Sequence, residues 1–152
     1  YLENKLKKFV IKNSMSDFVK FLGPMTAHSE NILNEYRNAD IFVHPSVVAY
    51  DGGKEGIPGT IVEAMFSGLT VVSTYHAGIP YIIKDGHTGL LAEENDVEKL
   101  HNNISMLINN LDMRKKIGEN ARKFAVENLD LSVKEKELEN IYDNLLNIYS
   151  LP

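Results

Sequence analysis

The sequence predicts an α/β fold in which a parallel sheet carries flanking helices and is followed by a helical C-terminal tail. Two apolar runs support this, one over 41–43 that stops at Pro45 and one over 71–72. Between them lie a loop rich in Gly and Pro and a helical pattern from Thr60 to Gly68. Because parallel strands need a crossover that is usually helical, this order is typical of a parallel sheet.

Composition limits the classes of protein that fit. The chain has 152 residues, is 43% hydrophobic and contains no cysteine, which excludes disulfides and thiolate metal sites. A net charge of −5 without a long basic block argues against nucleic acid as a partner. No apolar run approaches the ~20 residues of a membrane span, and the opening residues do not resemble a signal peptide.

The chain is predicted to be one partial domain over 1–152, with an α/β part over 1–94 and a helical part over 95–152. It begins with Tyr1 rather than Met, so we expect a piece of a longer protein.

Four elements are expected before the central loop. Helical spacing of apolar residues predicts a helix over 2–11, which Asn13-Ser14 would end. The run 18–22 is a strand candidate, closed by Gly23-Pro24. A helix over 30–38 and the strand over 41–43 follow.

Helices dominate the end of the chain. After an apolar run over 81–83 and a short strand over 89–91, three helices are predicted, with caps at Asn95 (boxed with Glu98), at Asp112, and at Ser132 (boxed with Glu135). Core packing is the interpretation of their three apolar stripes: Val97, Leu100, Ile104, Leu107 and Leu111; Met113, Ile117, Ala121 and Phe124; Leu138, Ile141, Leu145 and Ile148.

The loop before the central helix carries residues suited to a nucleotide sugar. Ligands of parallel sheets bind outside the carboxyl ends of the strands, and this loop leaves such an end. Small residues at Gly56, Pro58 and Gly59 would let a diphosphate approach the helix N-terminus, a natural anion seat. Glu55 lies in the loop and Glu63 is expected in the first helical turn; both carboxylates would accept hydrogen bonds from hydroxyl groups.

Structural interpretations of these residues stay open from spacing alone. Thr60 to Glu63 also fits a capping box, so Glu63 could simply close the helix. Glu55 could be a solvated loop charge. His44 and His76 follow strands and could line the cleft, or they could be hydrogen-bonded rings without a role in binding; no metal-ligand spacing is present.

Seven residues separate the two glutamates, which lie within Glu55-Gly56-Ile57-Pro58 and Glu63-Ala64-Met65. Further motifs accompany them: Arg37-Asn38-Ala39-Asp40, Phe42-Val43-His44-Pro45-Ser46, Val71-Val72-Ser73-Thr74, Gly78-Ile79-Pro80, Asp85-Gly86 and Thr88-Gly89. In order and spacing, the segment from about Phe18 to Asp96 resembles the family-four retaining glycosyltransferases of GT-B fold, whose hallmark is two glutamates separated by seven residues. The resemblance implies a Rossmann-like, partial C-terminal domain. Tyr81 departs from the pattern, because many members have a glutamate there.

The resemblance implies roles for these residues. Glu55 would be the catalytic residue and contact the donor sugar, and Glu63 would contact the ribose. The backbone over Gly56, Ile57, Pro58, Gly59 and Thr60 would approach the sugar and diphosphate, and Gly23, Pro24 and Met25 would lie near the base. The donor would be a UDP- or GDP-sugar, transferred with retention and without a required metal ion or other cofactor.

The same resemblance implies a missing partner. An N-terminal acceptor domain of the same enzyme would supply the other wall of the cleft, so residues 1–152 alone should be inactive. We expect a cytoplasmic enzyme of polysaccharide or glycolipid biosynthesis, with peripheral membrane association conceivable for the intact protein. Two alternatives differ in class: another GT-B sugar-nucleotide enzyme, such as an epimerase, and a non-catalytic sugar-nucleotide-binding module.

Overall fold

A computed structural model of the chain describes residues 2–26 and 29–149. The chain forms two compact units, one ending at Glu35 and the other beginning at Tyr36. Within the described residues, no helix is long and apolar enough to cross a membrane.

The first unit opens with helix α1, Leu2–Lys12, which confirms the predicted helix. Val10 is its one buried residue, so most of its apolar side chains are exposed. The helix ends as expected: the Asn13 amide donates to the Phe9 carbonyl, and Ser14 has a φ of 56°. A positive φ breaks the helical path, which explains the end of α1.

The strand predicted over 18–22 is wrong. These residues form turns and irregular backbone, and the Phe18 side chain is 86% exposed. A strand requires a paired neighbour for its N–H and C=O groups, which an apolar pattern alone cannot supply. Helix α2, Glu30–Asn38, has the predicted bounds and crosses the division between the units.

The second unit is built on a parallel sheet. Strands β1 (Ile41–His44), β2 (Thr70–Thr74) and β3 (Leu90–Ala92) lie in the order β1-β2-β3, all parallel. Helix α3, Gly59–Phe66, provides the crossover from β1 to β2. This confirms the predicted α/β class and places the carboxyl ends of all three strands at one edge.

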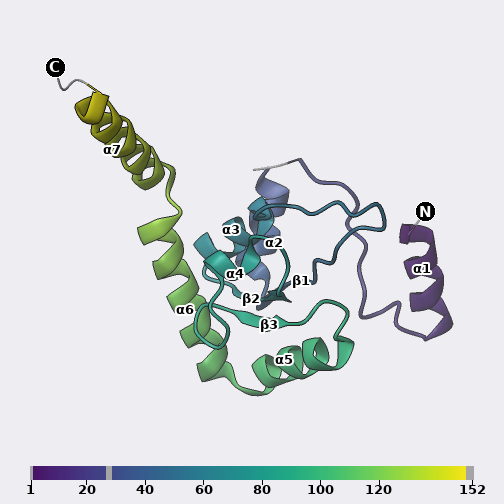
Figure 1. The fold of residues 1–152 in the computed structure, drawn as a ribbon. Helices are drawn as coiled ribbons and strands as arrows, with labels where there is room; N and C mark the ends of the chain where they lie inside the picture. Colours follow the sequence, from purple (N-terminus) through teal and green to yellow (C-terminus); the bar gives the residue numbers. More distant parts are fainter. Residues whose placement is uncertain (1, 27–28, 150–152) are drawn as a thin grey trace. The chain divides into compact units, whose positions relative to one another are not determined.

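Helices cover both faces of the sheet, α3 on one side and α5 (Val97–Asn109) on the other (Figure 1). Side chains alternate between faces along a strand, so Val71 and Val72 serve different sides. Val72 joins Leu90, Leu107 and Ile117 in a core cluster. Ile117 comes from α6, Leu111–Asn128, which also contacts α3 and α5.

The apolar run over 81–83 joins a short helix, α4, Ile79–Ile82, between β2 and β3. Ile82 and Ile83 are buried, while Tyr81 is 83% exposed. Tyr81 therefore does not serve the core.

The last apolar stripe is not part of a core. Helix α7, Leu131–Tyr149, has no buried residue among its described side chains. Its stripe residues Leu138, Ile141, Leu145 and Ile148 are 44–63% exposed. The core-packing interpretation is wrong for this helix, because nothing in the described part of the chain covers that face. In α5 and α6 it is confirmed for Leu107, Ile117 and Ala121, whereas Val97 and Leu111 are exposed.

The helix caps lie one or two residues away from those predicted. Asp96 rather than Asn95 caps α5 and accepts from the Lys99 N–H at 2.8 Å. Asn110 rather than Asp112 caps α6. Asp130 rather than Ser132 precedes α7; hydrogen bonds from the Ser132 hydroxyl and then from the Ser132 N–H lower the pKa of Asp130. At the start of each of these helices, two residues suited to a cap lie close together, and their spacing did not show which one is the cap.

The division at residue 94 does not coincide with the limit of a compact unit, since α5 and α6 pack against the sheet. How the whole protein divides into domains stays a prediction.

Candidate functional site

The loop between β1 and α3, residues 45–58, is hydrogen-bonded to the sheet at its start by two buried hydroxyls of β2. Ser73 Oγ donates to the His44 carbonyl, and Thr74 Oγ1 donates to the Ser46 carbonyl, both at 2.5 Å. Ser73 is fully buried and Thr74 nearly so. The loop therefore leaves the carboxyl edge of the sheet in a fixed direction.

A second attachment holds the middle of the loop. The Val48 N–H donates to Glu94 Oε2 at 2.8 Å, and Glu94 Oε1 lies 2.7 Å from His76 Nδ1. His76 is 1% exposed, so the buried-ring interpretation of this histidine is confirmed. The hydrogen bond from His76, followed by that from Val48, lowers the pKa of Glu94 and favours its carboxylate form.

The end of the loop rests on the turn after β2. The Gly78 N–H donates to the Gly56 carbonyl at 3.1 Å. A Cβ at Gly78 would lie 2.7 Å from Ile57 Cγ1 and 2.9 Å from the Gly56 oxygen. Only glycine permits this close approach, which places the backbone of 56–57 directly against the turn.

Glu55 lies on this fastened loop but is itself exposed. Its Oε1 accepts a hydrogen bond of 2.5 Å from Ser46 Oγ, and Ser46 Oγ lies 2.9 Å from His44 Nδ1. Glu55 is thus a surface carboxylate with one oxygen held by a buried serine, rather than a freely solvated loop charge.

Glu63 also has a hydrogen-bond partner, which belongs to the same unit. It is the fifth residue of α3 and lies beyond the first turn in which we expected it. Its Oε2 accepts a hydrogen bond of 2.9 Å from the Tyr36 hydroxyl. Burial and this hydrogen bond raise the Tyr36 pKa to about 12. The residue at the N-cap is Pro58, and no side chain caps α3, so the capping-box interpretation of Glu63 is wrong.

The N-terminus of α3 is open. Its first N–H groups have no acceptor within the helix, and a helix N-terminus attracts anions. Gly59 and Thr60 are exposed, and a Cβ built at Gly56 or Gly59 would meet no atom within 4 Å. The free space and the bare backbone together suit a phosphate group.

Glu55, Gly56, Ile57 and Pro58 form the end of the loop between β1 and α3, and Gly59, Thr60 and Glu63 belong to α3. Pro58 is buried and holds the start of α3, whose Ile61 and Val62 N–H groups bond to its carbonyl. Gly23, Pro24 and Met25 belong to the first unit, where Pro24 and Met25 line a hollow formed by residues of that unit. Their expected place near the base stays a prediction.

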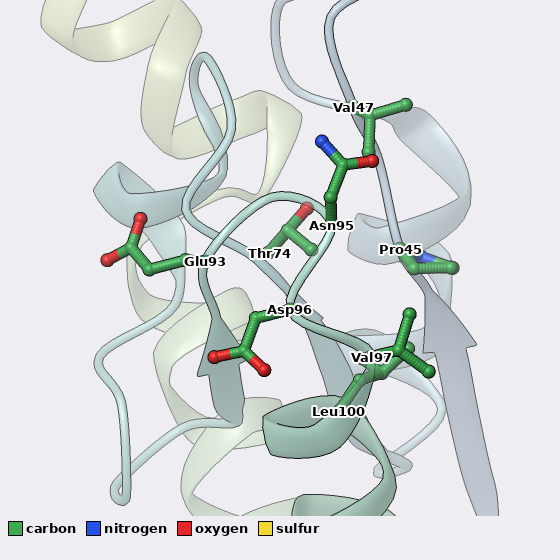
Figure 2. A pocket seen from close by; sticks show the side chains of 8 residues that line it. All are labelled: Pro45, Val47, Thr74, Glu93, Asn95, Asp96, Val97 and Leu100. Carbon is green, nitrogen blue, oxygen red and sulfur yellow. The ribbon is translucent and has the colours of Figure 1, made fainter.

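A separate apolar pocket of about 220 Å³ opens at the same edge of the sheet. Figure 2 shows its lining: Pro45, Val47, Thr74, Glu93, Asn95, Asp96, Val97 and Leu100. These residues follow β1, end β2, follow β3 and begin α5. Neither glutamate contributes, so this pocket is distinct from the loop site.

Four contacts of the site were not predicted from the sequence: Tyr36 with Glu63, Ser46 with Glu55, Gly78 with Gly56, and Glu94 with Val48. Ser46 and Gly78 lie within the motifs quoted for the resemblance, but the motifs did not indicate these contacts. Across residues 2–26 and 29–149, no group of three or more His, Cys, Asp or Glu could hold a metal ion.

Relatives with assigned names share this segment. The amylovoran biosynthesis glycosyltransferase AmsK of Erwinia amylovora is 42% identical over 99 residues, which are 65% of this chain and 24% of AmsK. The uncharacterized glycosyltransferase MJ1069 of Methanocaldococcus jannaschii is 31% identical over 143 residues, 94% of this chain and 34% of MJ1069. The chain therefore spans about a quarter to a third of these relatives.

Solved structures agree on the fold. The C-terminal domain of LpcC, a glycosyl transferase group 1 family protein of Francisella tularensis, is 28% identical with a TM-score of 0.74, and the match covers 86% of this chain and 63% of that domain. Anabaena HepE, solved in complex with UDP-glucose, is 24% identical with a TM-score of 0.77, covering 92% and 36%. These likenesses identify the fold as that of a GT-B C-terminal domain.

The model of one family matches residues 2–124, most of the chain, including the sheet, the loop and both glutamates. With the fold and the named relatives in agreement, the chain belongs to the glycosyl transferases group 1 family.

Proposed function

We propose that this chain is the donor-binding part of a longer retaining glycosyltransferase that transfers a sugar from a nucleotide diphosphate donor. The observation that carries the proposal is the pair of glutamates beside the open N-terminus of α3. Each has one carboxylate oxygen held by a hydroxyl, Glu55 by Ser46 and Glu63 by Tyr36. Hydroxyl-binding carboxylates on both sides of an anion seat match a ligand with sugar, diphosphate and ribose.

The two glutamates take different parts. Glu63 belongs to α3 and would accept hydrogen bonds from the ribose hydroxyls. Glu55 precedes the helix, faces the sugar and stabilises charge as it develops in the transition state. The backbone from Gly56 to Thr60 approaches the diphosphate.

The donor is a UDP- or GDP-sugar; the HepE complex with UDP-glucose supports the first. The acceptor wall of the cleft belongs to the remainder of the protein, so residues 1–152 alone transfer no sugar. The name of AmsK supports polysaccharide biosynthesis as the process. A cytoplasmic location and association with a membrane surface stay predictions.

The first experiment identifies the donor with the full-length protein that contains this chain. Release of UDP or GDP is followed for a panel of nucleotide sugars with and without extracts containing acceptors, and product anomers are assigned by NMR. Transfer with an unchanged anomer supports the proposal. Conversion of the donor without transfer would indicate an epimerase, and binding without either reaction a non-catalytic module.

The second experiment tests the two glutamates. Glu63→Gln replaces an acceptor oxygen with an amide donor, and a hydrogen bond to a charged group is worth roughly 1.5–3 kcal/mol. We expect about a tenfold or greater loss of UDP or GDP affinity, measured by calorimetric titration. Glu55→Ala should lower turnover while leaving that affinity nearly unchanged.

The control is Glu119→Gln, which changes an exposed glutamate of α6. It should behave as the wild type in both assays. If Glu55→Ala keeps wild-type turnover, the catalytic assignment is wrong.

A further inference from the structure

We infer that Ser46 is a positioning residue for Glu55, acting as the centre of a hydrogen-bonded chain of His44, Ser46 and Glu55. This inference rests on the proposed function of Glu55 and extends it. These hydrogen bonds join the end of β1 to Glu55, the carboxylate that we propose contacts the sugar.

Ser46 is the rigid member of the chain. Its side chain is 8% exposed, its N–H donates to the His44 carbonyl at 3.0 Å, and its own carbonyl accepts from Thr74 Oγ1. Glu55, by contrast, is exposed and lies nine residues further along, on a loop rich in glycine. The hydrogen bond from Ser46 therefore attaches one oxygen of the exposed Glu55 side chain to a buried residue at the edge of the sheet.

The positions of the protons in the two hydrogen bonds among His44, Ser46 and Glu55 follow from the number of protons that each group carries. A serine hydroxyl has one proton, and at 2.5 Å Ser46 donates it to the Glu55 carboxylate. The 2.9 Å contact between Ser46 Oγ and His44 Nδ1 then requires the imidazole to donate. His44 consequently carries its proton on Nδ1 whenever Glu55 is a carboxylate.

This arrangement leaves a defined oxygen for the ligand. With Oε1 of Glu55 held by Ser46, Oε2 keeps both of its lone pairs for hydrogen bonds from a sugar hydroxyl. When the carboxylate is already fixed before the ligand binds, less conformational entropy is lost during the reaction. Small displacements of reacting groups lower the rate strongly. Ser46 should thus act on turnover more than on nucleotide affinity.

The first test reads the proton directly and needs no substrate. NMR of the full-length protein with isotope-labelled histidine, at mildly alkaline pH, reports which nitrogen of His44 is protonated. We expect Nδ1–H in the wild type and a shift toward Nε2–H in Ser46→Ala and Glu55→Ala. An unprotonated Nδ1 in the wild type would overturn the inference.

The second test measures UDP release from UDP-glucose and GDP release from GDP-mannose, together with UDP and GDP titrations. Ser46→Ala should lower kcat about tenfold with unchanged nucleotide affinity, as expected for a lost hydrogen bond to a charged group. Ser46→Thr keeps the hydroxyl and should recover most of the rate. Ser105→Ala is the matched control, because Ser105 contacts His101 on α5 and has no carboxylate partner among the residues that the structure describes.

A double-mutant cycle separates this inference from the proposed function. In a Glu55→Ala background, adding Ser46→Ala should cost no further rate, because Ser46 acts through that carboxylate. If Glu55→Ala is inactive but Ser46→Ala matches the wild type, Ser46 has no positioning role and the proposed function survives. If Glu55→Ala is fully active, the proposed function itself fails.

Discussion

The Tyr36 hydroxyl donates a hydrogen bond of 2.9 Å to Glu63 Oε2 across 27 residues of sequence. Tyr36 also packs against Phe42 of β1, with ring centroids 5.8 Å apart. The end of α2, the first sheet strand and the proposed ribose-binding residue are thereby linked through one buried ring.

Tyr36→Phe should weaken nucleotide binding while keeping the ring in place. The lost hydroxyl leaves Glu63 free to rotate. Because Tyr36 acts on the nucleotide only through Glu63, we expect a smaller loss of UDP or GDP affinity than for Glu63→Gln, about fivefold. Calorimetric titration of the full-length protein measures it. Tyr142→Phe, on an exposed residue of α7, is the control, and equal affinities in both variants would remove Tyr36 from the site.

Tyr36 should ionise only near pH 12. Its pKa is raised from 10.0 to about 12, first by burial and then by the Glu63 carboxylate, so folding favours the neutral phenol. The contribution to stability is complete below pH 10 and is lost as the pH rises to 12, by at most about 1.4 kcal/mol per pH unit. An ultraviolet titration of tyrosinate compares the wild type with Tyr36→Phe. The difference curve should have its midpoint near pH 12; a midpoint near 10 would contradict the buried pairing with Glu63.

The sequence predicted those elements whose signals are local. Helix α2 and the three strands of the sheet came from apolar periodicity and turn residues, and their bounds agree within a residue or two. The segment 18–22 has the same apolar character as β1, yet only β1 has a neighbour that pairs with it. Pairing is a long-range property, and periodicity cannot report it.

The candidate site shows the same difference between local and long-range signals. Glu55 and Glu63 were identified by their spacing, which is local. Their partners Ser46 and Tyr36 lie 9 and 27 residues away, where only the folded chain brings them together. The exposed stripe of α7 shows the converse, because an apolar pattern indicates which face is to be covered but not whether the partner lies in this chain.

Glu94→Ala should detach the middle of the loop between β1 and α3, the loop that carries Glu55. The Val48 N–H loses its acceptor, so its protection from hydrogen exchange should fall, while Glu93→Ala should leave it unchanged. The lowered pKa of Glu94 gives the pH dependence: the contact is complete above the usual value of 4.5 and is lost as the pH falls through the lowered pKa. Protection of Val48 in the wild type should therefore persist at neutral pH and disappear only in acid. Loss of protection at pH 6 would show that Glu94 does not hold the loop.

Gly78→Ala should displace the loop that carries Glu55. The added methyl would lie 2.9 Å from the Gly56 carbonyl oxygen, which is backbone and cannot simply rotate away. A displaced catalytic loop lowers turnover roughly 10- to 100-fold. Turnover of the full-length protein measures this, and circular dichroism confirms that the variant is folded. A folded variant with wild-type turnover would mean that the contact with Gly56 does not set the position of Glu55.

Gly59→Ala should separate the demands of folding from those of the ligand. A Cβ at this first position of α3 meets no atom within 4 Å, and alanine is a better helix former than glycine, so the variant should be at least as stable as the wild type. The methyl would, however, stand in the space where we place the diphosphate. UDP or GDP affinity should fall, measured by calorimetric titration beside a thermal unfolding curve. An unchanged affinity in a stable variant would show that the anion does not approach α3 at Gly59 and would move the proposed diphosphate seat away from this helix.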